Sequence, residues 1–277
     1  MRSTCIWEGF ELSSNQSVDW QGNLACLKDE GLVIKSRHVV EGKHVFGPDS
    51  DYTTLAISGL ALLSEECDVK QIKIDSNIDE FPLQACGYLI DSSADWNISC
   101  DSESACISIS KSEDLTWEAN GEEFDTELYA KIQDAWVKEL NAVSQGAFVS
   151  EQAYRSGAPS RMNFISQQLG DIRIWPPREM IGDQRPHEAA PLTQAGTIES
   201  WTTLSAGGAP SEFSLRAPLL GGICTVYVRM DDGPCGVFLV ADDESNVPVI
   251  GNRVNFAVRR IYAQDGLIRY GLKALLS

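Results

Sequence analysis

The sequence predicts an α/β region followed by an all-β barrel or sandwich, joined by a helical segment. Residues 31–100 alternate between strand-like and helix-like patterns, whereas residues 197–272 contain short strand-like runs separated by turn residues. The balance of basic and acidic residues also changes along the chain. Residues 1–162 hold 12 Lys and Arg against 28 Asp and Glu, and residues 163–277 hold 10 against 12, which together give the net charge of −18. We therefore expect a domain boundary near residue 162.

The α/β region is predicted from alternating apolar patterns. Its strands carry β-branched residues in alternation, and its first helix has an apolar stripe formed by Leu55, Leu60 and Leu63, with Asp49 or Ser50 as the N-cap. Strand and helix alternate at a spacing typical of an α/β layer with parallel strands. The predicted order is strand 31–40, helix 49–66, strand 69–75, helix 82–90 and strand 94–100.

The helical segment between the two regions covers residues 121–162. Apolar residues recur at steps of three and four across 124–145, which predicts an amphipathic helix ending at Gly146. Residues 156–160 have the composition Ser-Gly-Ala-Pro-Ser and are predicted to form a loop.

The C-terminal region is predicted to be a β-barrel or a β-sandwich. Gly, Asp and Pro separate its short strands, as at 231–234 and 264–266, and Val254, Phe256 and Val258 are expected to face inward. The expected strands are 197–204, 214–217, 222–230, 236–241, 253–261 and 267–272.

Several ordered segments of the last part of the chain carry a family resemblance. They are Trp175-Pro176-Pro177-Arg178, the run from Gly196 to Thr202, Ala217-Pro218, Val226-Tyr227-Val228 before Asp231-Asp232-Gly233, the run from Ile250 to Val254, and the run from Gly266 to Leu272. Residues 164–277 resemble the acyl-CoA-associated OB-fold family, whose members combine a rubredoxin-like zinc ribbon with an OB barrel. The resemblance implies a ribbon arm over 163–195, an OB-fold barrel over 196–277, and an accessory role in a thiolase-type acyl-transfer assembly.

The ribbon departs from that family at its metal ligands. Where the family has cysteine pairs, this chain has Ser166, Leu169, Ile181 and Gln184. Zinc requires four N, S or O ligands with deprotonated donors, and Leu and Ile supply none. We therefore expect a degenerate ribbon arm without zinc, and no metal site.

The N-terminal part carries a second resemblance. Its segments are Gly31-Leu32-Val33, the run from Lys43 to Asp51, the run from Thr54 to Ile57, the run from Ile72 to Ser76, and the run from Ala94 to Cys100. They are similar to the opening of a hydroxymethylglutaryl-CoA synthase of the archaeal and bacterial kind. The resemblance implies a truncated thiolase-like region over 1–120.

The same resemblance places the acyl-accepting nucleophile on Cys100. The general base would fall near Asn77, which is not acidic, and the second half of a synthase is missing from the sequence. Thiolester chemistry needs a thiolate, a base and an oxyanion site together. We therefore expect Cys100 to be a non-catalytic relic.

Strand arginines are the other candidate ligand residues. Arg253, Arg259, Arg260 and Arg269 are candidates for contacting a CoA phosphate. The competing interpretation is that they are solvated or pair with carboxylates across the sheet.

Composition narrows the possible functions. An acidic chain repels phosphate backbones, so nucleic acid is not an expected partner. No apolar run reaches the length of a membrane span, and the first residues do not form a signal peptide. The eight cysteines form no C-x-x-C pair, so we expect reduced thiols and a cytoplasmic location.

The resemblance to the acyl-CoA-associated OB-fold family implies a non-catalytic scaffold subunit that bridges thiolase-like and synthase-like subunits. It would bind no cofactor itself, with a CoA thioester present at the level of the complex, and would form a hetero-oligomer through an exposed apolar sheet face in residues 31–120. One alternative is an acyl-carrying subunit in which Cys100 acts within a shared active site. The other is a single-strand nucleic-acid-binding OB protein, which the charge opposes.

Overall fold

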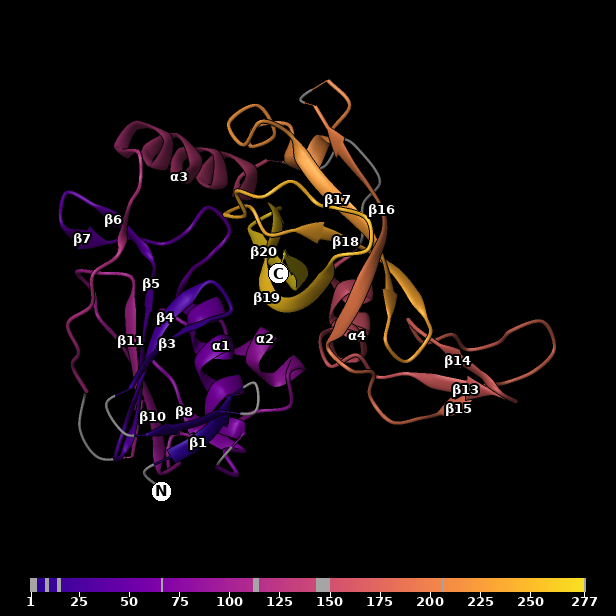
Figure 1. The fold of residues 1–277 in the computed structure, drawn as a ribbon, viewed down its shortest axis with the longest axis horizontal. Helices are drawn as coiled ribbons and strands as arrows, with labels where there is room; N and C mark the ends of the chain where they lie inside the picture. The colour runs from indigo at the N-terminus through magenta and orange to yellow at the C-terminus, as the bar shows by residue number, and fades with distance from the viewer. Residues whose placement is uncertain are drawn as a thin grey trace. The chain divides into compact units, whose positions relative to one another are not determined.

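The computed structural model describes residues 4–7, 10–13, 16–65, 67–111, 115–142, 150–205 and 207–276. Most of the regular structure is strand, and the chain divides into two compact units, Met1–Tyr129 and Ala130–Ser277 (Figure 1). The expected combination of a mixed α/β region and a β barrel is confirmed at this level.

A seven-stranded mixed sheet forms the centre of the N-terminal unit. Its order is β3-β4-β5-β11-β10-β8-β9. The strands are β3 (Ser17–Trp20), β4 (Asn23–Lys28), β5 (Gly31–Ser36), β8 (Gln71–Lys73), β9 (Leu89–Ile90), β10 (Trp96–Cys100) and β11 (Cys106–Ser110). Smaller sheets pair β1 (Thr4–Trp7) with β2 (Phe10–Ser13), and β12 (Glu122–Glu123) with β6 (His38–Val40) and β7 (Lys43–His44).

The expected parallel layer is only partly present. The two pairings of β8, with β9 and β10, are parallel, and the other pairings in this sheet are antiparallel. Short connections explain the antiparallel pairs β3–β4, β4–β5 and β10–β11, because a parallel pair needs a long crossover and an antiparallel pair does not. The β3–β4 turn is made by Gln21 and Gly22, both at positive φ.

Helix α1 (Tyr52–Ser64) packs on β5 and β11 and confirms the predicted helix. Its N-cap is Asp51 rather than Asp49 or Ser50. The Asp51 carboxylate accepts from the backbone N–H of Thr54, and the Thr54 hydroxyl accepts from the Asp51 backbone N–H. This reciprocal capping box satisfies two backbone donors, which Asp49 and Ser50 are too far upstream to do. A Cβ at Gly59 would lie 2.7 Å from Cδ1 of Ile109, so glycine allows the close approach of helix and sheet.

The remaining helices are α2 (Glu80–Ala85), α3 (Thr126–Leu140) and α4 (Glu151–Met162). Helix α2 starts before the expected residue, at the N-cap Asp79. Helix α3 confirms the amphipathic helix, while its expected C-terminal glycine at 146 lies outside the described residues.

The predicted loop at 156–160 is wrong, because those residues lie within α4. Ser150 caps this helix by accepting from the Ala153 backbone N–H, and Ala158 and Met162 on one face are buried. Tertiary packing therefore outweighs the weak helix propensity of Gly157 and Pro159.

A closed five-stranded barrel forms the core of the C-terminal unit, in the order β16-β17-β18-β20-β19. Its strands are β16 (Ala195–Leu204), β17 (Ile223–Met230), β18 (Cys235–Val240), β19 (Arg253–Gln264) and β20 (Leu267–Leu276). The pairing of β18 with β20 is parallel and the others are antiparallel. The barrel is OB-like, as expected, although the predicted strand at 214–217 is absent and a 3-10 turn at Ser211–Phe213 precedes that position.

The barrel interior is a single apolar cluster. Val254 and Phe256 belong to it as predicted, whereas Val258 is buried outside it. Phe164 contributes from beyond the barrel, with its ring centroid 5.1 Å from that of Phe256. The cluster consists of Phe164, Leu192, Ile198, Val226, Val228, Met230, Phe238, Val240, Val254, Phe256 and Ala274.

The expected ribbon arm is a small three-stranded sheet of β13 (Gln167–Leu169), β14 (Ile172–Ile174) and β15 (His187–Glu188). An isolated bridge joins Ile181 and Gln184. The Ser166 hydroxyl is used locally, because it donates to the backbone carbonyl of Ala190 at 2.7 Å. No group of potential metal ligands occurs in the described part of the chain.

The expected exposed apolar sheet face in residues 31–120 is not present. Leu89 is the one large hydrophobic side chain among the described residues of that range that is exposed. The sheet face opposite α1 holds small polar groups such as Ser99 and Ser108, and Ser108 accepts from the Leu115 backbone N–H. A polar sheet face does not need a partner protein to bury it. The expectation of a docking surface in residues 31–120, which rested on exposed apolar side chains, therefore does not hold. Within the described ranges, no helix combines the length and apolarity of a membrane span.

Candidate functional site

A pocket of about 560 Å³ lies in the C-terminal unit between helix α4, the segment of the ribbon arm that follows β14, and strands β17, β18, β19 and β20. Small-molecule sites in proteins have volumes of roughly 300–1,000 Å³. In OB folds the face formed by the second and third strands is a frequent binding face, and here those strands are β17 and β18. The pocket is therefore the strongest candidate site in this unit.

Helix α4 positions the first basic side chain of the pocket. The helix ends at Asn163, and Phe164 then adopts a left-handed conformation with φ of 50°. A left-handed residue with a bulky side chain is strained by about 1–2 kcal/mol. Burial of the Phe164 ring in the barrel core offsets this strain, and the last turn of α4, which carries Arg161, lies at the pocket.

Aromatic rings form one end of the pocket. Trp175 and Phe238 are stacked, with ring centroids 5.4 Å apart and an interplanar angle of 16°. Gly236 makes this packing possible, because a Cβ there would lie 2.8 Å from the Trp175 ring. The indole Nε1–H of Trp175 is buried and has no hydrogen-bond partner among the described residues. This end of the pocket is therefore aromatic and apolar, and its one unpaired donor is buried.

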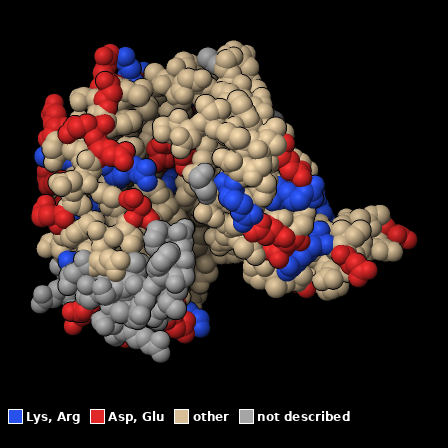
Figure 2. Space-filling view, viewed as in Figure 1, with Lys and Arg blue, Asp and Glu red and all other residues tan. Residues whose placement is uncertain are grey.

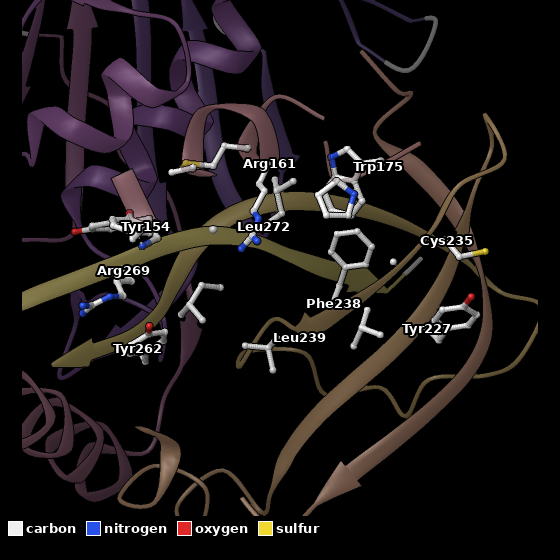
Figure 3. A pocket seen from close by; sticks show the side chains of 18 of the residues that line it. Tyr154, Arg161, Trp175, Tyr227, Cys235, Phe238, Leu239, Tyr262, Arg269 and Leu272 are labelled. Carbon is white, nitrogen blue, oxygen red and sulfur yellow. Dashed lines mark hydrogen bonds between the residues drawn. The ribbon is translucent and has the colours of Figure 1, made fainter. Parts of the chain in front are cut away.

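Arg269 and Tyr262 form the opposite end, with Arg161 between the two ends (Figure 3). The Arg269 guanidinium carbon lies 5.1 Å from the Tyr262 ring centroid, and Nη1 donates to the carbonyl oxygens of Gln264 and Leu267 at 3.4 Å. Burial raises the pKa of Tyr262, partly opposed by Arg269, so its hydroxyl stays protonated at neutral pH. Tyr154 of α4 accepts a hydrogen bond from the Tyr270 backbone N–H at 3.0 Å.

Sequence reasoning did not identify this pocket. Trp175 and Arg178 belong to the family resemblance, which implies no binding role for them. Arg161, Arg269 and Phe238 come from segments far apart in the sequence, so only the folded barrel brings them together. The sequence signal for this pocket is the Trp-Pro-Pro-Arg run, in which an aromatic residue and an arginine flank two turn-forming prolines.

Cys100 lies elsewhere, at the end of β10 in the N-terminal unit. It lines a hollow of about 210 Å³ together with Lys35, Asp101 and Glu118. Burial, and then the charges of Asp75 and Cys106, raise the pKa of its thiol to about 12. The thiol is therefore protonated at neutral pH, which disfavours nucleophilic attack.

Of the four arginines predicted to contact a CoA phosphate, Arg269 lines the pocket, and the other three are not brought together. Arg253 forms a bidentate pair with Asp231, with N–O distances of 2.5 and 2.6 Å, and this pair lowers the pKa of Asp231. Arg259 is fully buried, and Arg260 is buried with its guanidinium 4.2 Å from the Trp136 ring centroid. None of the three lines the pocket.

A buried charge cluster joins α3 to the barrel within the C-terminal unit. The Arg216 guanidinium is fully buried, donates to Glu139 at 2.8 Å and Asp242 at 3.1 Å, and lies 3.8 Å from the Trp136 ring centroid. Lys273 donates to the other oxygen of Asp242 at 2.5 Å. Burial raises the pKa of Glu139, and Arg216 partly opposes that rise. Such a cluster fixes the orientation of α3 rather than providing a ligand site.

Basic and acidic side chains lie side by side on the visible face of the C-terminal unit (Figure 2). Surface ion pairs of this unit include Arg229–Glu199, Arg253–Asp231 and Arg173–Asp232. Exposed pairs of this kind contribute about 0–1 kcal/mol each. They balance the charge of the barrel surface without adding much stability.

The comparisons with known proteins include a weak structural likeness. No protein-family model matches the chain, and no curated protein matches it. Among solved structures, a chain titled "Ltp2-ChsH2(DUF35) aldolase" is similar over 47% of this chain and 98% of its own length, with 14% sequence identity and a TM-score of 0.31. A likeness of this size does not by itself establish a shared fold. No family model or curated protein supports the resemblance of the N-terminal region to a synthase.

Proposed function

We propose that this protein is a non-catalytic accessory subunit of a thiolase-type acyl-CoA acyltransferase assembly. In this proposal it works in the cytoplasm, contacts a thiolase-like and a synthase-like subunit, and holds no cofactor of its own. The observation that carries the proposal is the barrel. Residues 195–276 form a closed OB-like barrel, preceded by a three-stranded arm, in the same segment whose sequence resembles the acyl-CoA-associated OB-fold family.

The surroundings of Cys100 support a non-catalytic role. A thiol with a pKa of about 12 is almost entirely protonated at neutral pH. No histidine lines the hollow beside it, and Asn77 stands where a synthase would have its glutamate base. The chain therefore presents a thiol without the base that would activate it.

Reconstitution tests this proposal. The purified chain is mixed with a thiolase-like subunit from the same organism, and the mass in solution is measured by light scattering, followed by acyl-CoA turnover. We expect a stable complex, and no turnover by the chain alone. A well-behaved monomer that forms no complex would contradict the accessory role. Enzyme-like turnover by the chain alone, lost in Cys100→Ala, would favour the alternative in which Cys100 carries the acyl group.

A further inference from the structure

The charge of the pocket in the C-terminal unit differs from that of the chain as a whole. Arg161, Arg178 and Arg269 line it, and no Asp or Glu among the described residues does, although the chain has 40 acidic residues against 22 basic ones. In a chain of this composition, a pocket with only basic charges is selective for an anion.

Two of these arginines are available to a ligand. Arg161 and Arg178 are exposed, and neither has a carboxylate partner in the described ranges. Surface arginines such as Arg229 and Arg253 do hold a carboxylate. The backbone N–H of Arg178 donates to Gln167 Oε1 at 2.7 Å, which fixes the chain at that point and leaves the guanidinium unused.

The walls of the pocket select an apolar body. Trp175 and Phe238 present stacked rings, and Leu239 and Leu272 line the same cavity (Figure 3). The Trp175 Nε1–H is a buried donor without a partner among the described residues, and leaving such a donor unpaired is unfavourable. A ligand acceptor at this end would remove that penalty.

We propose that this pocket binds a small organic carboxylate with an aromatic or alkyl body. The carboxylate pairs with Arg161 and Arg178, and the body lies against Trp175 and Phe238. A polyanion such as single-stranded nucleic acid fits less well, because the net charge of −18 repels it at long range while a monoanion meets mainly the local arginines. The inference does not rest on the accessory role, since the chain alone contains every residue of the pocket.

Calorimetric titration of the full-length chain tests the proposal. The probe is 2-naphthoate, with 2-naphthol as its neutral counterpart, and quenching of tryptophan fluorescence is the second readout. The test variant is the double substitution Arg161→Gln and Arg178→Gln. The matched control is Arg229→Gln, because Arg229 lies on the barrel surface outside the pocket.

We expect 2-naphthoate to bind the wild-type chain and the Arg229→Gln variant with equal affinity. The double variant should bind it about tenfold or more weakly, as expected for lost charge-assisted hydrogen bonds. Binding of 2-naphthol should be weaker and the same in all three proteins. Because both substituted arginines are exposed, the variants should keep the wild-type circular dichroism spectrum.

Three results would overturn the proposal. They are absence of naphthoate binding at about 1 mM, equal affinity for naphthoate and naphthol, or unchanged affinity in the double variant. Tighter binding of adenosine 3′,5′-bisphosphate or of a deoxythymidine oligomer than of naphthoate would also overturn it, in favour of a nucleotide ligand.

Discussion

Substitution of Arg216 by glutamine should strongly destabilise the C-terminal unit. The guanidinium is fully buried and contacts two carboxylates that are themselves buried, those of Glu139 and Asp242. Glutamine removes the positive charge, so that buried Glu139 loses its ion-pair partner and Asp242 keeps only Lys273. Breaking a buried ion pair by removing one partner costs about 3–5 kcal/mol. The lost contact with the Trp136 ring adds to this, by about 1–2 kcal/mol at a desolvated site.

Hydrogen–deuterium exchange of peptides from β19 and β20 measures this effect within the barrel itself. A loss of 3 kcal/mol or more corresponds to amide exchange faster by roughly a hundredfold or more, when exchange reports the opening equilibrium. The matched control is Arg253→Gln, which breaks the exposed pair with Asp231 and should cost about 0–1 kcal/mol. Equal exchange in the two variants would refute the assignment of Arg216 as the buried anchor of this unit.

The same variant should show a defined pH dependence. Burial holds the pKa of Glu139 above its ordinary value, so the folded state binds this proton more tightly than the unfolded state does. Loss of Arg216, which lowers that pKa, should raise it further. As the pH falls through the folded-state pKa, Glu139 becomes neutral and the buried uncompensated charge disappears. The stability defect of Arg216→Gln should therefore be smaller at acidic than at neutral pH, and a defect that grows on acidification would contradict this.

Four other outcomes are expected. Gly31→Ala should destabilise the N-terminal sheet by about 1–3 kcal/mol, because the new Cβ would overlap the Ile109 carbonyl oxygen of the neighbouring strand. Gly157→Ala in α4, where the nearest atom would lie 3.8 Å away, should instead stabilise its helix by about 0.5–1 kcal/mol; urea unfolding compares the two, and equal effects would be the contrary result. Alkylation of Cys100 by iodoacetamide, followed by peptide mass spectrometry, should keep rising with pH toward about 12, and a plateau near neutral pH would contradict the raised pKa. The purified chain should carry no stoichiometric zinc by elemental analysis, because Leu169 and Ile181 stand at ligand positions, and one tightly held zinc per chain would contradict this.

The sequence alone determined the elements whose causes are local. Alternating apolar residues predicted β5 and β19, and the three- and four-residue spacing of apolar residues predicted α3, because side-chain periodicity follows directly from backbone geometry. Turn residues separated the barrel strands well enough to predict a β-barrel or a β-sandwich. The sequence also shows that the arm lacks the cysteine pairs of the family it resembles, since the ability to bind zinc depends on residue type.

The tertiary structure decided what depends on contacts between distant segments. Hydrophobic periodicity does not contain strand direction, so the mixed sheet around β8 could not be read from it. Packing of Ala158 and Met162 made a helix of a segment whose composition indicates a loop. The pocket also depends on packing between segments that are distant in the sequence. Arg161, Trp175 and Arg269 are separated by long stretches of sequence, and they line one cavity because the barrel closes and the end of α4 and the segment of the arm that follows β14 lie against it. A binding site of this kind depends on distances in space, which a linear pattern of residue types does not specify.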